Sequence, residues 1–353
     1  MKTDAKILIC YNSPTSIFSV YNGKPSDNGT MLNDLSELGF SKQIGKIKKN
    51  LHKYFPAVES FAIDRNVQRI INKLNNFSPN IIFNFVESVE GISNYEYCSV
   101  GLFELLGFQY TGNTPSCLGN CLDKERAKNI LRSFKIETPE SVVINKSKGI
   151  IEKDFKLKYP VILKLLSEDA SIGISEYSVV YNLHDLKKHV EFLTSTYHQD
   201  VLAEEYIDGR ELNVAILGNR VLPISEITFN GLPESLPKIV TYDGKWIEHS
   251  VYYENTIPMC PAQLDPKIKK EVESVALSAF EALGCRDYAR VDIRLDKNNK
   301  PFVIEVNPNP DISEDSGFSR AAAADGLSYT DLLCGIANFA LERHKNDTKS
   351  KVS

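Results

Sequence analysis

Three polar residues near the C-terminal end of the chain have the types and the spacing of a metal site. Asp292 lies in one alternating apolar stretch, and Glu305 and Asn307 lie in the next. The polar run between the two stretches, residues 296–300, predicts a β-hairpin turn. Period-two alternation then places Asp292 opposite Glu305, with Asn307 two residues further along the same face. Two carboxylates and an amide oxygen on a rigid sheet are hard ligands, of the kind that Mg²⁺ accepts beside phosphate oxygens.

A surface hairpin with a charged outer face would show the same pattern, so the hairpin alone does not establish a metal site. The segment that follows the second strand, Asn307-Pro308-Asn309-Pro310, favours one. A strand that ends in a constrained loop is a common place for a binding site. We therefore predict a magnesium site at this end of the hairpin.

Two lysines in unusual surroundings indicate what the metal would serve. Lys164 interrupts the apolar run that begins at Val161, so its ammonium is predicted to be half buried and to need a partner such as a phosphate. Lys124 lies in the first turn of a predicted helix, where the helix dipole does not favour a cation. For either lysine alone, the simpler interpretation is a solvated surface residue. Beside an oxygen-rich metal site, the two together indicate a nucleoside triphosphate.

The sequence lacks the common nucleotide- and zinc-binding motifs. No Gly-x-Gly-x-x-Gly follows the first apolar strand. Cys117 and Cys121 are four residues apart, but there is no second pair, so we predict thiols of the core or of a loop rather than a zinc site.

The elements that would hold these residues predict an α/β chain in three parts. Residues 1–118 follow the order strand, helix, strand, which is typical of a parallel sheet. Residues 119–200 contain two short strands around a loop of small residues, which predicts a small antiparallel lobe. Residues 201–342 contain the metal hairpin and a long amphipathic helix. The polar residues 343–353 are predicted to form a disordered tail.

The composition disfavours nucleic-acid-binding, membrane-spanning and disulfide-rich proteins. The 353 residues carry 41 basic and 46 acidic side chains, a formal net charge of −5, which disfavours nucleic acid or an anionic membrane as the main partner. The chain contains no uninterrupted apolar run of the ~18–20 residues that a membrane span needs. Its seven cysteines are an odd number and are scattered, which favours a reducing cytoplasm over a disulfide scaffold.

Several further segments occur in a fixed order with the metal hairpin. They are Leu122–Lys128, Pro160–Lys164, Ala170–Ser175, Glu204–Leu212, Val214–Gly218, Gly284–Asp292 and Ile304–Pro310. In order and spacing they resemble the ATP-grasp superfamily and, within it, the D-alanine–D-alanine ligase family. The resemblance implies an α/β ATP-grasp fold: an N-terminal parallel α/β domain, a small central α+β lobe and a C-terminal α+β lobe with the metal site. Family members are often dimers through the first domain, so a homodimer is an option.

The resemblance also implies a role for each matching residue. Lys124 and Lys164 would hold ATP phosphates, and Glu211 would meet the ribose. The hinge beside adenine would consist of Glu204, Glu205, Tyr206 and Ile207. Two Mg²⁺ ions, or Mn²⁺ in their place, would be bound by Asp292, Glu305 and Asn307. Reaction steps would be assisted by Ser171 in the loop over the γ-phosphate, by Lys245 and by Arg290, which would face the reacting carbonyl.

The implied reaction joins a carboxylate to an amine. The carboxylate attacks the γ-phosphate of ATP to give an acyl phosphate, the amine attacks that activated carbonyl, and Arg290 stabilises the oxyanion. The substrates would be amino acids or a short peptide. Ser316 corresponds to the family's serine for the second substrate's carboxylate.

Three departures from the family leave the substrate open. The region after the first strand, residues 11–16, lacks the acid that binds the first substrate's ammonium. The family's histidine- and glycine-rich stretch after the second long strand is altered at residues 84–91, where Glu87 or Glu90 is a candidate replacement for that acid. Ala170 and Trp246 occupy the positions of the serine and tyrosine that link the phosphate loop to the lid. A ligase for D-alanine and a ligase for other amino acids or a peptide are thus both open. A catalytically inactive nucleotide-binding protein is a further alternative, which the retained metal ligands and Arg290 disfavour.

Overall fold

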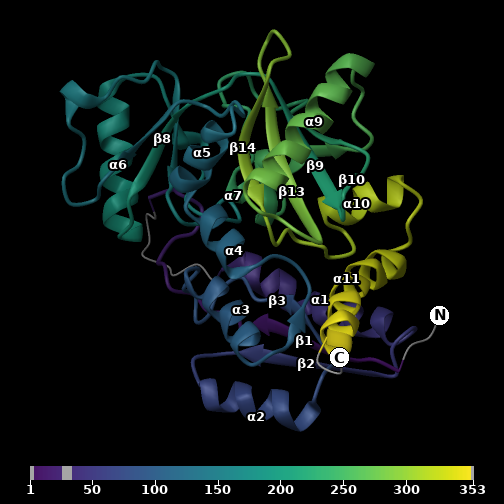
Figure 1. The fold of residues 1–353 in the computed structure, drawn as a ribbon. Helices are drawn as coiled ribbons and strands as arrows, with labels where there is room; N and C mark the ends of the chain where they lie inside the picture. Colours follow the sequence, from purple (N-terminus) through teal and green to yellow (C-terminus); the bar gives the residue numbers. More distant parts are fainter. Residues whose placement is uncertain (1–3, 26–33, 351–353) are drawn as a thin grey trace.

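The apolar strands of the chain assemble into three sheets, which are arranged as three lobes in Figure 1. The computed structural model describes residues 4–25 and 34–350. Within those ranges no helix has both the length and the apolar character needed to cross a membrane.

The N-terminal domain is built on a parallel sheet with the strand order β2-β1-β3-β4. Its strands are β1 (Lys6–Asn12), β2 (Ala57–Ile63), β3 (Ile81–Phe85) and β4 (Gln109–Tyr110), and its helices are α1 (Leu35–Leu51), α2 (Val67–Phe77) and α3 (Tyr95–Leu105). The middle of β1, residues 7–10, is continuously apolar because both of its faces are covered: Ile7 and Ile9 belong to one core cluster, and Leu8 and Cys10 to another. The predicted parallel sheet is confirmed.

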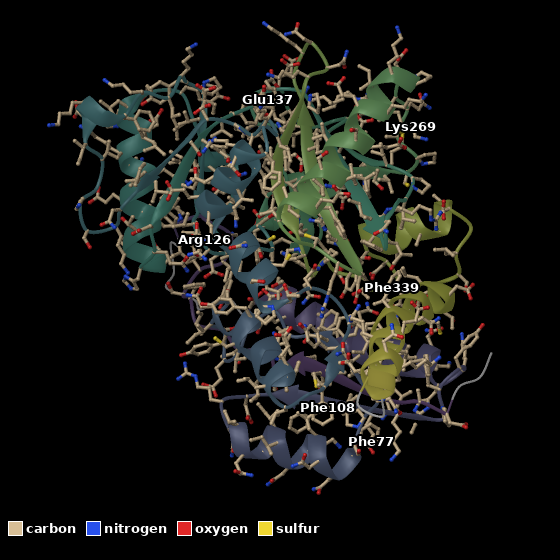
Figure 2. All side chains as sticks on the ribbon, viewed as in Figure 1. Phe77, Phe108, Arg126, Glu137, Lys269 and Phe339 are labelled. Atoms are coloured by element: carbon tan, nitrogen blue, oxygen red, sulfur yellow. The ribbon has the colours of Figure 1, made fainter. Side chains whose placement is uncertain are left out.

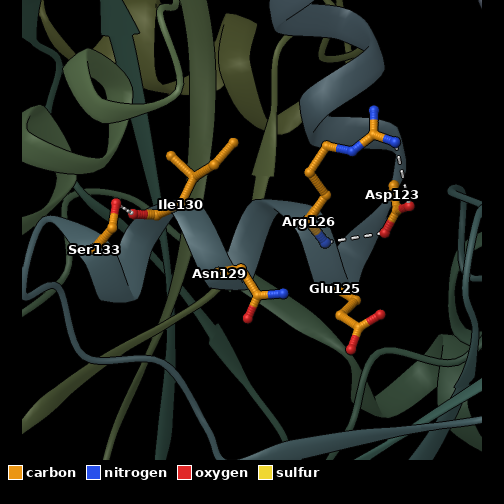
Figure 3. A pocket seen from close by; sticks show the side chains of 6 residues that line it. All are labelled: Asp123, Glu125, Arg126, Asn129, Ile130 and Ser133. Atoms are coloured by element: carbon orange, nitrogen blue, oxygen red, sulfur yellow. Dashed lines mark hydrogen bonds and ion pairs between the residues drawn. The ribbon is translucent and has the colours of Figure 1, made fainter.

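Two short helices connect this domain to the rest of the molecule: α4 (Pro115–Leu122) and α5 (Lys124–Ser133). Asp123 separates them and caps α5, because its carboxylate accepts a hydrogen bond from the backbone N–H of Arg126 at 3.0 Å. Figure 3 shows this cap at the edge of an open surface depression lined by residues of α5. The cap fixes Lys124 as the first residue of its helix.

The central lobe contains an antiparallel sheet with the order β5-β8-β6-β7. Its elements are β5 (Ser141–Ile144), the 3₁₀ turns η1 (Glu152–Asp154) and η2 (Glu176–Ser178), β6 (Val161–Leu165), β7 (Val179–Val180), α6 (Leu183–Tyr197) and β8 (Val201–Glu205). The boundary predicted after residue 200 separates β8 from this lobe, whereas β8 is hydrogen-bonded between β5 and β6. The chain therefore leaves the central sheet only after Glu205.

The C-terminal lobe contains a larger antiparallel sheet, β12-β11-β9-β13-β14, with β10 paired to β9. Its strands are β9 (Arg210–Leu217), β10 (Arg220–Val221), β11 (Ser225–Thr228), β12 (Ile257–Met259), β13 (Tyr288–Leu295) and β14 (Pro301–Asn307). Its helices are α7 (Tyr242–Trp246), α8 (Val251–Asn255), α9 (Pro266–Ala282) and α10 (Gly317–Ala324), whereas the last helix, α11 (Tyr329–Ser350), packs on α1 and the sheet of the N-terminal domain.

Alternation along β13 divides the roles of its side chains. Ala289, Val291 and Ile293 pack with α9 in one core cluster, and the outward face of α9 carries exposed side chains such as Lys269 (Figure 2). The residues between them, Arg290 and Asp292 among them, point to the opposite side of the sheet. The sheet thereby presents its charged residues to the other lobes.

The prediction of a disordered tail from residue 343 is wrong as far as the structure describes the chain. α11 continues to Ser350, and the guanidinium of Arg343 in its extension pairs with Asp287 at 2.6 Å and donates to the carbonyl of Tyr110 at 2.7 Å. Residues 351–353 lie outside the described part. Contacts with two separate parts of the fold hold the polar end of the helix in place.

Candidate functional site

A cleft of about 820 Å³ lies where the three lobes meet. With one exception, every residue that the sequence singled out for a role lines it. These residues are Glu87, Lys124, Lys164, Ser171, Glu204, Glu205, Tyr206, Ile207, Glu211, Lys245, Arg290, Asp292, Glu305, Asn307 and Ser316. The fold thus gathers residues that are far apart in the sequence.

The exception is Glu90. It sits in a tight turn with a φ of +54°, beside Gly91, and its carboxylate lies 3.1 Å from the Nε of Arg65. Its side chain is 47% exposed, and it does not line the cleft. The turn directs Glu90 away from the site, so of the two acids proposed from the sequence only Glu87 faces the cleft.

The predicted metal ligands lie side by side on the hairpin. Asp292 is paired with Glu305 across β13 and β14, as predicted, with a bulge directly after this pair. The side-chain amides of Asn307 and Asn213 donate to the carboxylate of Asp292 at 3.0 and 2.7 Å. Arg290 binds the same carboxylate through two hydrogen bonds of 2.7 and 2.8 Å. A dense polar network therefore orients the ligand set.

The charge state of Glu305 suits a metal ligand. Burial alone would raise the pKa of this carboxyl, but the ammonium groups of Lys124, Lys164 and Lys245 and the guanidinium of Arg290 lower it to about 2. Glu305 is therefore ionised at neutral pH. Two carboxylates and an amide are a donor set that fits Mg²⁺.

Lys124 reaches from the start of α5 into the cleft. Its ammonium donates to the backbone carbonyl of Glu168 at 2.5 Å and lies 3.2 Å from Asp169 and 3.3 Å from Glu305. Burial alone would lower the pKa of Lys124, but the two carboxylates raise it above its ordinary value. The charge is therefore retained inside the cleft, directly beside the metal ligands.

Lys164 is held by Glu204. The two side chains form an ion pair between β6 and β8, and the second oxygen of Glu204 lies 2.8 Å from the ammonium of Lys128 on α5. Glu204 is 2% exposed. Burial would raise the pKa of this carboxyl, but the two ammonium groups lower it to about 2. The predicted hinge residue thus uses its carboxylate to position Lys164.

Arg294 braces the rest of the hinge. It donates to Glu211 at 2.7 Å and to the carbonyl of Ile207 at 2.8 Å, and its guanidinium lies 5.0 Å from the ring centre of Tyr206. The sequence shows Arg294 only as a charged residue on the same face as Arg290 and Asp292. Its role was missed because its partners, Glu211 on β9 and the hinge itself, come from separate segments.

The loop after β6 is tied to the segment that carries α7. Trp246 Nε1 donates to the carbonyl of Ala170 at 3.1 Å, and the hydroxyl of Ser171 donates to the carbonyl of Val240 at 3.1 Å. Ala170 and Ser171 both have positive φ, which turns the loop over the cleft. Lys245 lines the cleft next to Trp246, and burial together with the charge of Arg290 lowers its pKa.

The N-terminal domain contributes acidic side chains to the cleft. Residue Glu87 is exposed to the open cleft, but desolvation by the surrounding protein and the neighbouring charges of Asp311, Asp169 and Glu37 raise its pKa to about 8. In the described part of the chain, no side chain or backbone group donates a hydrogen bond to the carboxylate of Glu87.

Glu37 differs from Glu87, because its carboxylate accepts hydrogen bonds from Asn12, Thr15 and Ser88 at 2.6–2.8 Å. The sequence analysis missed Glu37. Ser316 caps α10, whose N-terminus faces the cleft, by accepting from the N–H of Ser319 at 3.2 Å.

Comparison with known proteins gives a consistent result. A family model described as the D-Ala–D-Ala ligase C-terminus matches residues 131–338. The D-alanine–D-alanine ligase of Bordetella pertussis is 35% identical over 240 residues, which cover 67% of this chain and 71% of the relative. An uncharacterised protein of Sinorhizobium fredii is 34% identical over 265 residues, 75% of each chain.

Solved structures agree at the level of the fold. The structure of D-alanine–D-alanine ligase from Bacillus anthracis, described as complexed with ATP, superposes with a TM-score of 0.72. The superposition covers 97% of this chain and 100% of that one, at 24% sequence identity.

Proposed function

This chain belongs to the D-alanine–D-alanine ligase family and has its ATP-grasp fold, and we propose that it is an ATP- and Mg²⁺-dependent carboxylate–amine ligase that acts through an acyl phosphate. One observation carries the proposal: a single cleft brings two lysines from separate elements, α5 and β6, to an ionised, oxygen-rich ligand set. Phosphoryl transfer depends on neutralised charge and alignment more than on covalent help from the protein. This arrangement supplies both.

Asp292, Glu305 and Asn307 would hold two Mg²⁺ ions, or Mn²⁺ in their place. When bound, the metal would neutralise phosphate charge at the cleft. The fit rests on the donor set, which consists of hard oxygen ligands with Glu305 ionised at neutral pH. Asn213 and Arg290 keep the Asp292 carboxylate in a fixed orientation.

The nucleotide would lie along β6, β8 and β9. Lys124 and Lys164 bind its phosphates, and the loop at Ser171 covers the γ-phosphate. The main chain of the hinge, residues 204–207, contacts adenine, since the carboxylate of Glu204 is already bound to Lys128 and Lys164. Glu211, held by Arg294, meets the ribose.

The reaction then has two steps. One carboxylate oxygen of the first substrate attacks the γ-phosphorus of ATP, the bond to the β-phosphate oxygen breaks, and ADP leaves. The neutral amine of the second substrate attacks the acyl carbonyl, inorganic phosphate leaves with the electron pair of the broken carbon–oxygen bond, and the proton released by the nitrogen is taken up by that phosphate. Arg290 stabilises the negative charge on the tetrahedral carbonyl oxygen. Lys245 adds positive charge from the α7 side, and the closed loop excludes water from the acyl phosphate.

The substrates would be amino acids or a short peptide. Glu87 is the best candidate to bind the first substrate's ammonium, because it faces the cleft and no group of the described chain donates a hydrogen bond to it. Ser316 would meet the second substrate's carboxylate at the N-terminus of α10. Reactions of this class fit a protein of the cytoplasm, and D-alanine would place the reaction in peptidoglycan synthesis.

The test measures ADP release and product mass with Mg²⁺-ATP and a panel of D- and L-amino acids, supplied singly and in pairs. ADP release coupled to a product whose mass is the sum of the two substrates minus one water supports the ligase. D-Ala–D-Ala as that product would identify the substrate as D-alanine. ATP binding without turnover on any pair, with peptides included, would favour an inactive nucleotide-binding protein.

A further inference from the structure

Three cysteine sulfurs converge beneath the cleft. Cys117 and Cys121 lie one turn apart on α4, and Cys285 lies in the loop between α9 and β13. The three sulfur atoms all lie within 4.8 Å of one another, and the sulfurs of Cys117 and Cys285 are 3.5 Å apart. Spacing of four residues puts the two helix thiols on one face. The sequence showed only this pair, because Cys285 is 168 residues further along the chain than Cys117.

The spacing of the sulfurs suits a shared metal ion. A metal–sulfur bond of about 2.3 Å in tetrahedral geometry separates two sulfurs by roughly 3.8 Å. A disulfide would require a separation of about 2.05 Å and would use only two of the three thiols. The Cys117–Cys285 separation of 3.5 Å is close to this value, and the 4.8 Å limit on the other two separations leaves all three sulfurs within reach of one ion.

The surroundings of the cluster also favour a site for a cation bound by thiolates. Cys117 and Cys121 are buried, whereas Cys285 is partly exposed, so it is the member of the cluster that solvent reaches most easily. Asn113 Oδ1 accepts from the thiol of Cys117 at 3.6 Å and from the backbone N–H of Arg286 at 2.6 Å, which keeps Arg286 next to the thiols.

Arg286 supplies a counter-charge at this site. Its Nε donates to the carbonyl of Gly112 at 2.8 Å, but its Nη2 is buried without a hydrogen-bond partner among the described residues. Three thiolates around a divalent cation carry one net negative charge. A guanidinium with an unused donor is suited to balance that charge.

We propose that Cys117, Cys121 and Cys285 bind a thiophilic metal ion, Zn²⁺ in the first instance, as three thiolates. On binding, each thiol loses its proton to solvent, and a water beside the partly exposed Cys285 completes the coordination. The ion would link α4 to the loop before β13. α4 leads directly to Lys124, and β13 carries Arg290 and Asp292. The site is structural and is separate from the magnesium site, so it does not depend on the proposed ligase reaction.

The experiment uses the full chain, purified under reducing conditions and stripped with a chelator. We expect it to take up one Zn²⁺ per chain in competition with a chromogenic chelator and to unfold at a higher temperature when loaded. Cys285→Ser, at the partly exposed position, should weaken Zn²⁺ binding at least tenfold. Cys98→Ser, at an exposed thiol on α3 outside the cluster, should bind as the wild type does.

A spectroscopic measurement avoids dependence on the folding of variants. Co²⁺ added to the stripped wild type should give thiolate-to-metal charge-transfer absorption, and Zn²⁺ should abolish it. Three results would overturn the proposal: Zn²⁺ uptake that is equal in Cys285→Ser and wild type, a Co²⁺ spectrum without the charge-transfer band, or no uptake by the reduced wild type.

Discussion

The guanidinium of Arg290 donates two parallel hydrogen bonds to the carboxylate of Asp292, from Nε to Oδ1 at 2.7 Å and from Nη2 to Oδ2 at 2.8 Å. The proposed oxyanion-stabilising residue and a proposed metal ligand are thus one unit, two residues apart on β13. A paired arrangement of this kind fixes the guanidinium plane, which a single hydrogen bond would leave free to rotate. Loss of Asp292 is therefore expected to disturb both metal binding and the orientation of Arg290.

The first prediction follows from this pairing. Asp292→Asn should lower kcat at least about a hundredfold, because it removes a metal ligand and the charged partner of Arg290. Steady-state turnover and, separately, the Kd for ATP are the measurements. Glu281→Gln, at an exposed carboxylate on α9 of the same lobe, is the matched control. Turnover of Asp292→Asn at the wild-type level would refute the assigned metal site.

The second prediction concerns stability. Glu204→Gln should lower the free energy of unfolding by about 3–5 kcal/mol, because it removes the buried carboxylate that pairs with the ammonium groups of both Lys128 and Lys164. Urea denaturation measures the change, and Glu140→Gln, at an exposed acid just before β5, serves as the control. Equal stability of the two variants would show that the buried ion pairs contribute little.

The carboxylate of Glu204 also predicts how the stability of the protein depends on pH. Its folded pKa is about 2, below the ordinary value of 4.5, so its contribution to stability is complete above 4.5 and is lost as the pH falls towards 2. In this acid range the wild type should lose stability more steeply with falling pH than Glu204→Gln does. Parallel curves for the two proteins would contradict the assignment.

The third prediction concerns the first substrate. Glu87→Gln should raise its KM roughly ten- to a hundredfold, the loss expected for a charge-assisted hydrogen bond. Glu90→Gln is the matched control, because it makes the same substitution at a side chain that pairs with Arg65 and does not line the cleft. An elevated KM for Glu90→Gln alone would reverse the choice between the two acids.

The raised pKa of Glu87 gives this site a pH profile. The carboxyl has a pKa of about 8 and binds an ammonium only when ionised, so the KM of the first substrate should fall as the pH rises towards 8 and level off above it. The Glu87→Gln variant should lack this fall. The profile should be recorded with saturating ATP, so that it reports the amino-acid substrate alone.

The fourth prediction uses Trp246, the single tryptophan of the chain. Its indole N–H holds the loop at Ala170, so Mg²⁺-ATP should change the intrinsic fluorescence of the wild type. Trp246→Phe removes a link of about 1 kcal/mol, which should raise the KM for ATP roughly fivefold and increase ATP hydrolysis without product. Tyr181→Phe, at an exposed ring on the central lobe, should change neither quantity. Unchanged coupling in Trp246→Phe would show that the link is dispensable.

The sequence predicted those parts of the fold in which local pattern and burial agree. The hairpin was predictable because alternation in β13 separates Val291 from Asp292 by face. The edge strand β2 was missed, because Ala57–Ile63 is mostly half-buried and includes Glu59 and Ser60, so it has no continuous apolar run. The resemblance to the ligase family was confirmed, since it rested on ordered segments rather than on one motif.

The parts that could not be predicted depend on contacts between distant segments. Glu37 follows Asp34 by three residues, which is the pattern of a helix cap, and its actual partners, Thr15 and Ser88, lie outside the helix. Cys285 lies beside α4 in the fold, but no pattern in the sequence around Cys285 or around α4 predicts this contact. The positive φ of Glu90 turns its side chain away from the cleft, so that of the two acids only Glu87 faces it.

The position of α11 has a consequence for how the molecule is made. Leu332, Leu333 and Ile336 of this helix belong to the same apolar cluster as Ile7 and Ile9 of the first strand. During synthesis, the N-terminal sheet therefore leaves the ribosome with part of one face uncovered, and it stays so until the last tenth of the chain has emerged. The N-terminal sheet thus precedes α11 in synthesis but is completed only when α11 packs on it, and a nascent chain that stalls before α11 would be a substrate for chaperones.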